Sequence, residues 1–274
     1  MPQIAGRTVI SCAFARPDDP CLPRIQLAAQ MIDKNSPMGG AANTGTAEPQ
    51  LAAEAVRLGL ESGVIAALYP AIDQARLVRY PPGSTLYNEG AGVEALYVIR
   101  RGMIKLLRYV GDGSARIVRL HNRASIIGLN GLLGETHDHT AIAVDEVQVY
   151  QLPIVLLMPL RDNDPAAYSC LIEQWGNYLN SADTWISEFS SGPIRSRVAR
   201  LLRFVVDFDS DTGSEELTLL TGVEMAEVLG VTPESVSRVI ADFKRSDILK
   251  PLEGAGQMER YRCNLEALEH ESHN

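Results

Sequence analysis

The sequence predicts an α+β protein in which a small antiparallel β domain is joined by a long helix to a winged helix-turn-helix. Between 77 and 152, short apolar or β-branched runs alternate with turn signals roughly every ten residues, which is typical of a small sandwich or barrel. Between 165 and 191, apolar side chains recur with heptad spacing. Between 221 and 245, two short helical patterns flank a glycine-containing turn.

Composition and charge are those of a globular protein. Of the 274 residues, 46% are hydrophobic and 22% are charged. No apolar run approaches the roughly 18 residues that span a membrane, and the N-terminus lacks the pattern of a signal peptide. We therefore expect a cytoplasmic protein without a membrane partner. The net charge of −9 excludes a broadly basic surface, so any DNA contact needs a local basic face.

The four cysteines, Cys12, Cys21, Cys170 and Cys263, are scattered through the chain. This spacing predicts no disulfide framework and fits a reducing compartment. We interpret them as ordinary thiols, with a redox role for Cys12 and Cys21 as the alternative.

Breaks in the pattern divide the chain into four parts. We expect a poorly ordered extension at 1–50, a β domain at 51–163, the long helix at 164–192 and the winged helix at 193–274. The extension contains a stretch rich in glycine, proline and small polar residues at 36–49, which is typical of a linker. Apolar spacing favours short helices between 51 and 68.

Seven short strands are predicted in the β domain. They lie at 77–80, 85–87, 95–100, 104–110, 116–120, 141–144 and 147–152. Pro81-Pro-Gly83 and Gly111-Asp-Gly113 are among the turns between them. Pro153 is expected to open the helical part of the chain.

The long helix carries a stripe of large apolar residues. They are Leu171, Trp175, Tyr178, Ala182, Trp185 and Phe189, spaced four, three, four, three and four residues apart. Such a stripe packs either on the protein's own sheet or on a partner helix. We favour a partner helix and hence a homodimer, because the period is 3.5 and the segment runs unbroken for roughly 40 Å.

After Ser191-Gly-Pro193, a helix is expected at 194–208 and an acidic loop at 207–216. Thr221 then forms a capping-box pattern with Glu224, and Gly230 ends that helix. Thr232 caps the second helix. Two strands at 248–252 and 260–263 flank Glu253-Gly-Ala-Gly256, which predicts the wing.

The outer side of the second helix carries side chains that suit a major groove of double-stranded DNA. We expect the DNA contacts from Thr232, Glu234, Ser235, Ser237, Arg238 and Lys244. Arginine bonds guanine O6 and N7 together, and a carboxylate accepts from cytosine N4. Glu234 and Arg238 are one turn apart, so both can address one G·C pair. An ordinary surface Glu–Arg pair is the alternative.

The sequence resembles the Crp/Fnr family of transcription regulators from about 68 to 265. The motifs that carry the resemblance are Tyr80-Pro-Pro-Gly-Ser-Thr-Leu-Tyr-Asn-Glu-Gly90, Leu96-Tyr-Val-Ile-Arg-Arg-Gly102 and Leu229-Gly-Val-Thr-Pro-Glu-Ser-Val-Ser-Arg238. The resemblance implies a cyclic-nucleotide-binding-like antiparallel β-roll, a dimerisation helix and a winged helix that reads a palindrome. It also implies RNA polymerase as a partner.

Two positions place the recognition helix nearer to the Fnr branch of that family. Ser237 directly precedes Arg238, as in the Fnr branch, whose half-sites resemble TTGAT. Pro233 stands where the cAMP-responsive branch carries an arginine. We therefore expect a TTGAT-like palindrome.

The cAMP-binding pattern of the family is not retained. The glutamate and arginine that hold the ribose and the cyclic phosphate are replaced in the stretches Gly128-Leu129 and His139-Thr140. The threonine–serine pair that contacts adenine falls on Ala182-Asp183. Because a cyclic phosphate would lack its bidentate partner, we expect a signal other than cAMP, or none. Gly128, Leu129, His139 and Thr140 remain the expected effector pocket.

An iron–sulfur cluster and haem are the other cofactors that sensors of this family could carry. An iron–sulfur cluster needs closely spaced cysteines, which this chain lacks. Haem or metal sensing stays an alternative, with His121, His137 and His139 near the expected pocket. Solvated histidines in a polar turn are the plainer interpretation, so no metal site is predicted.

Two alternative functions belong to other classes of protein. A cupin-type metal enzyme needs a glutamate four to five residues after the His-x-His and a later histidine, and this pattern is not met from His139. We therefore expect no enzyme. A nucleotide-binding-like module that acts on protein partners would not need the winged helix.

Overall fold

The computed structural model describes residues 58, 60, 62–111, 113–209, 216–252 and 260–273. The expected extension at 1–50, with Cys12 and Cys21, lies outside the described residues. No described helix is both long and apolar enough to span a membrane.

The first part of the described chain is a β-roll of two four-stranded antiparallel sheets. One sheet has the order β1 (Arg76–Tyr80), β8 (Val147–Pro153), β3 (Ala95–Arg101) and β6 (Ile126–Ile127). The other has the order β2 (Thr85–Tyr87), β7 (Thr140–Ala143), β4 (Ile104–Tyr109) and β5 (Ala115–His121). The seven predicted strands are all present.

The roll has one core between its sheets and another beneath the helices. Between the sheets, side chains of β3 and β8 meet those of β4 and β7, for example Ile99 with Ile104. On the outer face, α3 (Ser62–Ile72) and the beginning of α5 (Pro165–Ser190) cover the first sheet. The short elements η1 (Leu129–Leu133), η2 (Ile154–Leu156) and α4 (Leu160–Asn163) complete this cover.

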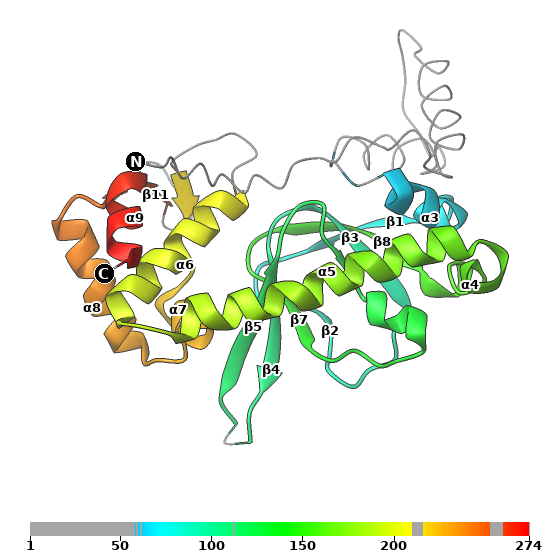
Figure 1. Ribbon diagram of the computed structural model, residues 1–274, viewed down its shortest axis with the longest axis horizontal. Helices are drawn as coiled ribbons and strands as arrows, with labels where there is room; N and C mark the ends of the chain where they lie inside the picture. The colour runs from blue at the N-terminus through cyan, green and yellow to red at the C-terminus, as the bar shows by residue number, and fades with distance from the viewer. Residues whose placement is uncertain are drawn as a thin grey trace, which may run out of the picture.

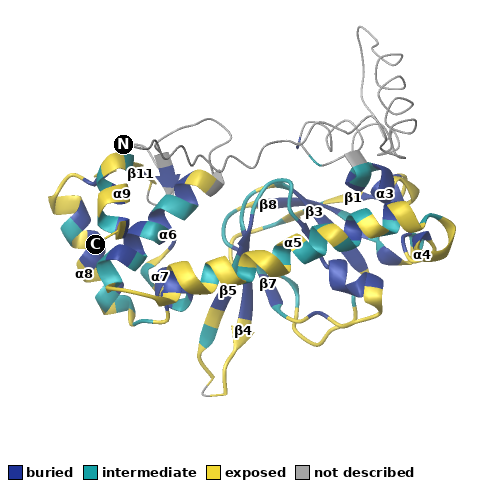
Figure 2. Cartoon of the chain, viewed as in Figure 1, coloured by how far each residue is buried: buried dark blue, intermediate teal, exposed yellow. Residues whose placement is uncertain are grey.

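Helix α5 runs along the roll and continues into the second part of the chain (Figure 1). Asp164 caps its first turn, where its carboxylate accepts from the amide of Ala167 at 3.2 Å. Proline at the first helical position suits this start because its missing N–H has no helical partner. Along most of its length α5 shows exposed and half-buried residues (Figure 2).

The second part is a winged helix. Its helices are α6 (Ile194–Asp209), α7 (Gly222–Leu229), α8 (Pro233–Arg245) and α9 (Leu265–His273). Its sheet has the order β10 (Leu249–Pro251), β11 (Arg260–Cys263) and β9 (Glu216–Thr218). The predicted hairpin is confirmed.

Several boundaries differ from those expected. Pro153 ends strand β8 instead of opening the helical part, and Asp207 lies within α6 instead of a loop. The sequence analysis also missed β6, β9 and α9. Strands of two or three residues are too short to show an alternation. The polar helix α9 is held by ion pairs, Arg195 with Glu271 and Arg203 with Glu269, which no local pattern reveals.

Candidate DNA-binding site

Helix α7 is fixed at both ends by the residues that the sequence indicated. The Thr221 hydroxyl accepts from the amide of Glu224 at 3.2 Å, and the Glu224 carboxylate accepts from the amide of Thr221 at 2.9 Å. This reciprocal pair is the predicted capping box. Gly230 ends the helix at φ 65°, a left-handed conformation that glycine adopts without strain.

Helix α8 follows after one residue of turn. Thr232 is its N-cap and accepts from the amide of Ser235 at 3.4 Å. The helix is strongly two-sided, because apolar residues recur on the side that packs on α6 and α7. Its buried residues are Val236, Val239, Ile240 and Phe243. The opposite side is thereby turned to solvent.

The expected base-reading residues lie on that solvent side. Thr232, Glu234, Ser237 and Arg238 are exposed, whereas Ser235 is half-buried and shares a hydrogen bond of 3.1 Å with the Thr232 hydroxyl. The Arg238 guanidinium donates to the Glu234 carbonyl oxygen at 3.4 Å and to the Ser235 hydroxyl at 3.3 Å. Its charged end therefore rests over the first turn, the part of a recognition helix that meets base edges.

Lys244 has a contact that the sequence analysis did not foresee. Its ammonium group lies 4.7 Å from the centroid of the Tyr261 ring, on strand β11 of the wing. Lys244 thus joins α8 to the wing. The alternating burial of β11 instead exposes Arg260 and Arg262, which the sequence analysis missed. The alternation Arg-Tyr-Arg-Cys was the available signal.

Most of the predicted dimer stripe packs within its own chain. Leu171 is fully buried in the core beneath the roll's helices, where Trp175 and Tyr178 also pack. Phe189 is buried in the winged-helix core, and Trp185 packs beside it. The assignment of Leu171 and Phe189 to a dimer interface is therefore wrong, because a side chain with no free surface cannot contact a partner.

A second stripe on α5 carries the exposed apolar side chains. Leu179 is 48% exposed and Ile186 is 60% exposed, and the half-buried Ile172 lies seven residues before Leu179. Their seven-residue spacing continues the heptad one position beyond the predicted stripe. Ala182, a member of the predicted stripe, is half-buried between the two faces.

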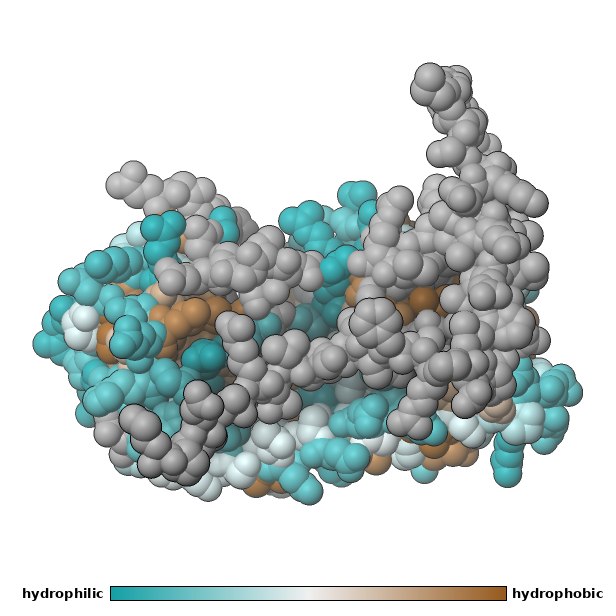
Figure 3. Space-filling model, turned by 45° about the horizontal axis from the view of Figure 1, so that its top comes forward, coloured by the Kyte–Doolittle hydropathy of each residue, from teal (hydrophilic) through white to brown (hydrophobic). Residues whose placement is uncertain are grey.

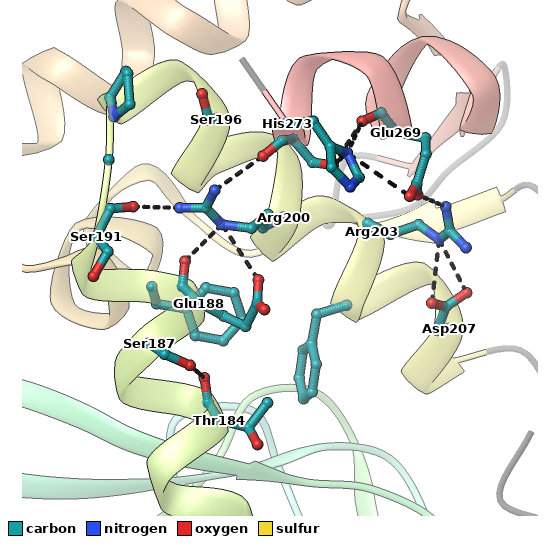
Figure 4. A pocket seen from close by; sticks show the side chains of 15 residues that line it. Thr184, Ser187, Glu188, Ser191, Ser196, Arg200, Arg203, Asp207, Glu269 and His273 are labelled. Atoms are coloured by element: carbon teal, nitrogen blue, oxygen red, sulfur yellow. Dashed lines mark hydrogen bonds and ion pairs between the residues drawn. The ribbon is translucent and has the colours of Figure 1, made fainter. Parts of the chain in front are cut away.

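The end of α5 is tied to the winged helix by rings and arginines. Trp185, Phe189 and Phe204 meet edge-on with centroids 4.7 to 5.7 Å apart. Arg197 donates to the carbonyl oxygens of Phe189 and Leu229. In Figure 4, Arg200 reaches from α6 to the corner that follows α5, beside a cavity of about 760 Å³.

The four residues expected to form an effector pocket have different surroundings. Gly128, at φ 90°, lies against the carbonyl of Ala95, and Leu129 is buried in the core. The Thr140 hydroxyl accepts from the amide of Glu89 at 3.1 Å. His139 borders a cavity. The effector pocket formed by these four residues therefore stays a prediction.

The cavity that His139 borders lies at the junction of β5, α5 and α7 and has a volume of about 640 Å³. Arg116 and Arg119 of β5, Arg197 of α6 and Glu227 of α7 face it. Burial lowers the pKa of Arg119, an effect that the Tyr178 phenol opposes. Three arginines therefore line this cavity together with Trp185.

The three histidines have different surroundings. His137 stacks on Tyr87 with ring centroids 3.5 Å apart, and burial lowers its pKa to about 4. Burial, with the nearby Arg119 charge, lowers the pKa of His121 to about 3. Among the described residues, no three His, Cys, Asp or Glu side chains are grouped as a metal site.

Comparison with known proteins adds two family matches. Residues 77–164 match the model of the cyclic nucleotide-binding domain, and residues 196–271 match that of the Crp-like helix-turn-helix domain. The first covers the roll from β1 to α4, and the second covers the winged helix.

Two similar proteins are named as regulators. The fumarate and nitrate reduction regulatory protein of Vibrio cholerae is 26% identical over 171 residues, which cover 61% of this chain and 68% of that protein. The transcriptional regulator LdrP of Thermus thermophilus is 24% identical over 196 residues, 71% of this chain and 95% of that protein. FixK2 from Bradyrhizobium japonicum shares the fold, with a TM-score of 0.63 at 21% identity over 72% of this chain and 96% of that one. The order of roll, long helix and winged helix, together with these matches, shows that the chain belongs to the Crp/Fnr family of DNA-binding transcription regulators.

Proposed function

We propose that this regulator binds a palindromic, TTGAT-like site as a homodimer, with Glu234 and Arg238 reading the bases. The single observation that carries this proposal is the exposure of both side chains on the first turns of α8. Hydrophilic residues form most of the outer rim at the winged-helix end of the molecule (Figure 3). Four basic side chains are exposed on α8 and the wing: Lys244, Arg245, Arg260 and Arg262. Local positive charge of this kind is compatible with a net charge of −9, because phosphate contacts depend on local charge.

The test compares two arginines of the same helix. Fluorescence anisotropy with a labelled TTGAT palindrome would be measured for the wild type, Arg238→Ala and Arg245→Ala. Loss of a bidentate base contact costs about 1–3 kcal/mol, so Arg238→Ala should weaken this site about 5- to 150-fold and scrambled DNA far less. Arg245→Ala should weaken both DNAs by the same factor. The proposal fails if both variants behave alike, or if the wild type does not prefer the palindrome.

We place the dimer contact on the second stripe of α5, formed by Ile172, Leu179 and Ile186. Its support is the exposure of Leu179 and Ile186 and their seven-residue spacing. Two parallel copies of α5 would set the two α8 helices about 34 Å apart, one turn of DNA. Such a dimer would act with RNA polymerase in the cytoplasm.

The signal is proposed to be a ligand other than cAMP, or none. The support is the chemistry of the roll, because Leu129 and His139 supply neither the carboxylate nor the guanidinium of the cAMP-binding pattern. Titration with cAMP should leave the anisotropy of the DNA complex unchanged. A haem-responsive sensor is the second candidate, and an absorption spectrum of the purified protein with or without a Soret band decides it.

A further inference from the structure

The β4–β5 hairpin of the roll lies against helix α7 of the helix-turn-helix. Near the start of α7, the Lys105 ammonium is 2.9 Å from the Glu224 carboxylate, and the two side chains are only 15% and 12% exposed. At its end, the Arg116 guanidinium occupies the space that a Cβ on Gly230 would need. Apolar residues of the hairpin and of α7 share one core between these two contacts: Leu107, Ile117, Val228 and Leu229.

The Glu224 carboxylate divides its two oxygens between the roll and its own helix. Oε1 accepts from Lys105, and Oε2 accepts from the Thr221 amide at 2.9 Å and the Thr221 hydroxyl at 2.8 Å. Burial tends to raise the pKa of Glu224, but the hydrogen bonds from Lys105 and Thr221 outweigh it and lower that pKa. The carboxylate that caps α7 is therefore also the point at which the roll holds α7.

A second carboxylate of α7 depends on the same lysine. Burial raises the pKa of Glu227, and the Lys105 charge opposes that rise. The Glu227 Oε2 atom is buried and has no hydrogen-bond partner among the described residues. Removal of the Lys105 charge would therefore leave α7 with two partly buried carboxylates that lack a nearby positive charge. Because such uncompensated charges are costly, their presence favours movement of α7 away from the roll.

Movement of α7 would carry the recognition helix with it. Only Gly230, Val231 and the N-cap Thr232 separate α7 from α8, and the two helices share their core. The exposed side chains Glu234 and Arg238 are not covered by the roll while the Lys105–Glu224 contact is made. The contact therefore leaves the recognition helix α8 accessible to DNA while it restrains the position of that helix.

We propose that Lys105 is a positioning residue for DNA binding: its ion pair with Glu224 holds α7, and through it α8, in the orientation that reads DNA. The inference rests on the proposed DNA reading by α8. It adds a route between the roll and the recognition helix that does not pass along α5. A displacement of strand β4 would reach the base-reading residues through this ion pair.

The test uses four single variants of the full chain and the double variant Lys105→Met with Glu224→Gln. Lys105→Met removes the charge at similar volume, and Lys105→Arg keeps it. Glu224→Gln removes the opposite charge but retains the capping box, which glutamine also forms. Arg108→Met is the matched control, because Arg108 lies on the same strand, is exposed and pairs only weakly with Glu89 at 3.7 Å. Affinity for the palindrome and amide hydrogen exchange of α7 and α8 are measured for each.

Lys105→Met and Glu224→Gln should each weaken palindrome binding about 5- to 30-fold and speed amide exchange in α7 and α8. Without the ion pair, α7 and α8 must be ordered at the moment of binding, and this ordering reduces the affinity. The double variant should lose no more than either single variant, because both act on one interaction. Lys105→Arg should restore most of the affinity, and Arg108→Met should change neither measurement.

Four results would overturn the proposal. Unchanged DNA affinity with faster exchange would make the contact merely structural, and tighter DNA binding by Lys105→Met would make it inhibitory. Equal effects of Arg108→Met would indicate general loss of charge. Exchange of α8 that is unaltered by Lys105→Met would break the link between the helices. That last measurement needs no DNA, so it separates failure of this inference from failure of the proposed DNA site.

Discussion

Arg200 donates from Nε to the backbone carbonyl oxygen of Glu188 at 2.7 Å, so a side chain of α6 closes the last turn of α5. The same guanidinium donates to the carbonyl oxygens of Ser191, in the corner, and Ser272, near the end of α9 (Figure 4). The last carbonyl groups of a helix have no partner within it. One residue therefore satisfies three backbone acceptors from three segments and makes the corner stiff.

Replacement of this guanidinium should weaken the corner more than replacement of its neighbour. Arg200→Lys keeps the charge but cannot reach three carbonyls, and we expect the free energy of unfolding to fall by about 1–3 kcal/mol. Arg203→Lys affects ion pairs with the exposed Asp207 and Glu269. Because exposed ion pairs contribute little, it should change the free energy of unfolding by less than about 0.5 kcal/mol. Urea denaturation measures both. Equal losses would show that the carbonyl contacts of Arg200 contribute nothing special.

Alanine at Gly230 should cost at least as much stability as alanine at another glycine of positive φ. Both Gly230 and Gly83 have positive φ, 65° and 78°, but nothing lies within 4 Å of a Cβ on Gly83, whereas Arg116 fills that space at Gly230. Gly83→Ala should therefore cost only the backbone strain, about 1–2 kcal/mol. Gly230→Ala should cost the same strain plus the small cost of moving the flexible Arg116 guanidinium, and it should also weaken DNA binding. A smaller loss for Gly230→Ala in denaturation experiments would contradict the packing of Arg116.

Buried His121 should make the protein less stable in mild acid. Its ring meets Tyr178 edge-on at 5.0 Å, and its pKa is lowered to about 3 from 6.5. Between pH 6.5 and 3 the unfolded chain binds the proton and the folded chain does not, so stability falls as pH falls through that window. His121→Leu should reduce the slope by about 1.4 kcal/mol per pH unit, equivalent to one proton. Denaturation midpoints at several pH values check this, and an unchanged slope would place a charged imidazole in the folded state.

The second stripe of α5 should control the oligomeric state. A carboxylate at Leu179 or Ile186 would be buried without a partner in a helix pair, so Leu179→Asp and Ile186→Asp should give monomers. Val155→Asp is the control, because Val155 is 68% exposed but lies on the roll, in η2. Sedimentation velocity distinguishes the forms. A dimer that survives both α5 substitutions would place the interface elsewhere.

The strands and caps were predictable because their signals are local. Thr221 and Glu224 are three residues apart, and that spacing alone is enough to form the capping box seen in the structure. Gly230 and Thr232 likewise mark the end of one helix and the start of the next by their own backbone and side-chain preferences. Glycine- and proline-rich turns delimited the seven strands in the same way.

Local signals of this kind could not predict the surroundings of the expected effector residues, nor the contact between Lys105 of the roll and Glu224 of α7. Leu129 and His139 were grouped by their places in a family pattern, but the fold buries one in the core and sets the other on a cavity. Lys105 and Glu224 are 119 residues apart, and nothing in either local pattern indicates that they meet.

By itself, the sequence determined the order of roll, long helix and winged helix, and the side of α8 that carries Glu234 and Arg238, because helix periodicity and caps depend only on neighbouring residues. The tertiary structure decided which apolar stripe of α5 packs inward. Leu171 and the exposed Leu179 belong to two stripes with the same heptad period on one helix. Only the position of the roll and of the winged-helix core shows which stripe is buried and which is exposed.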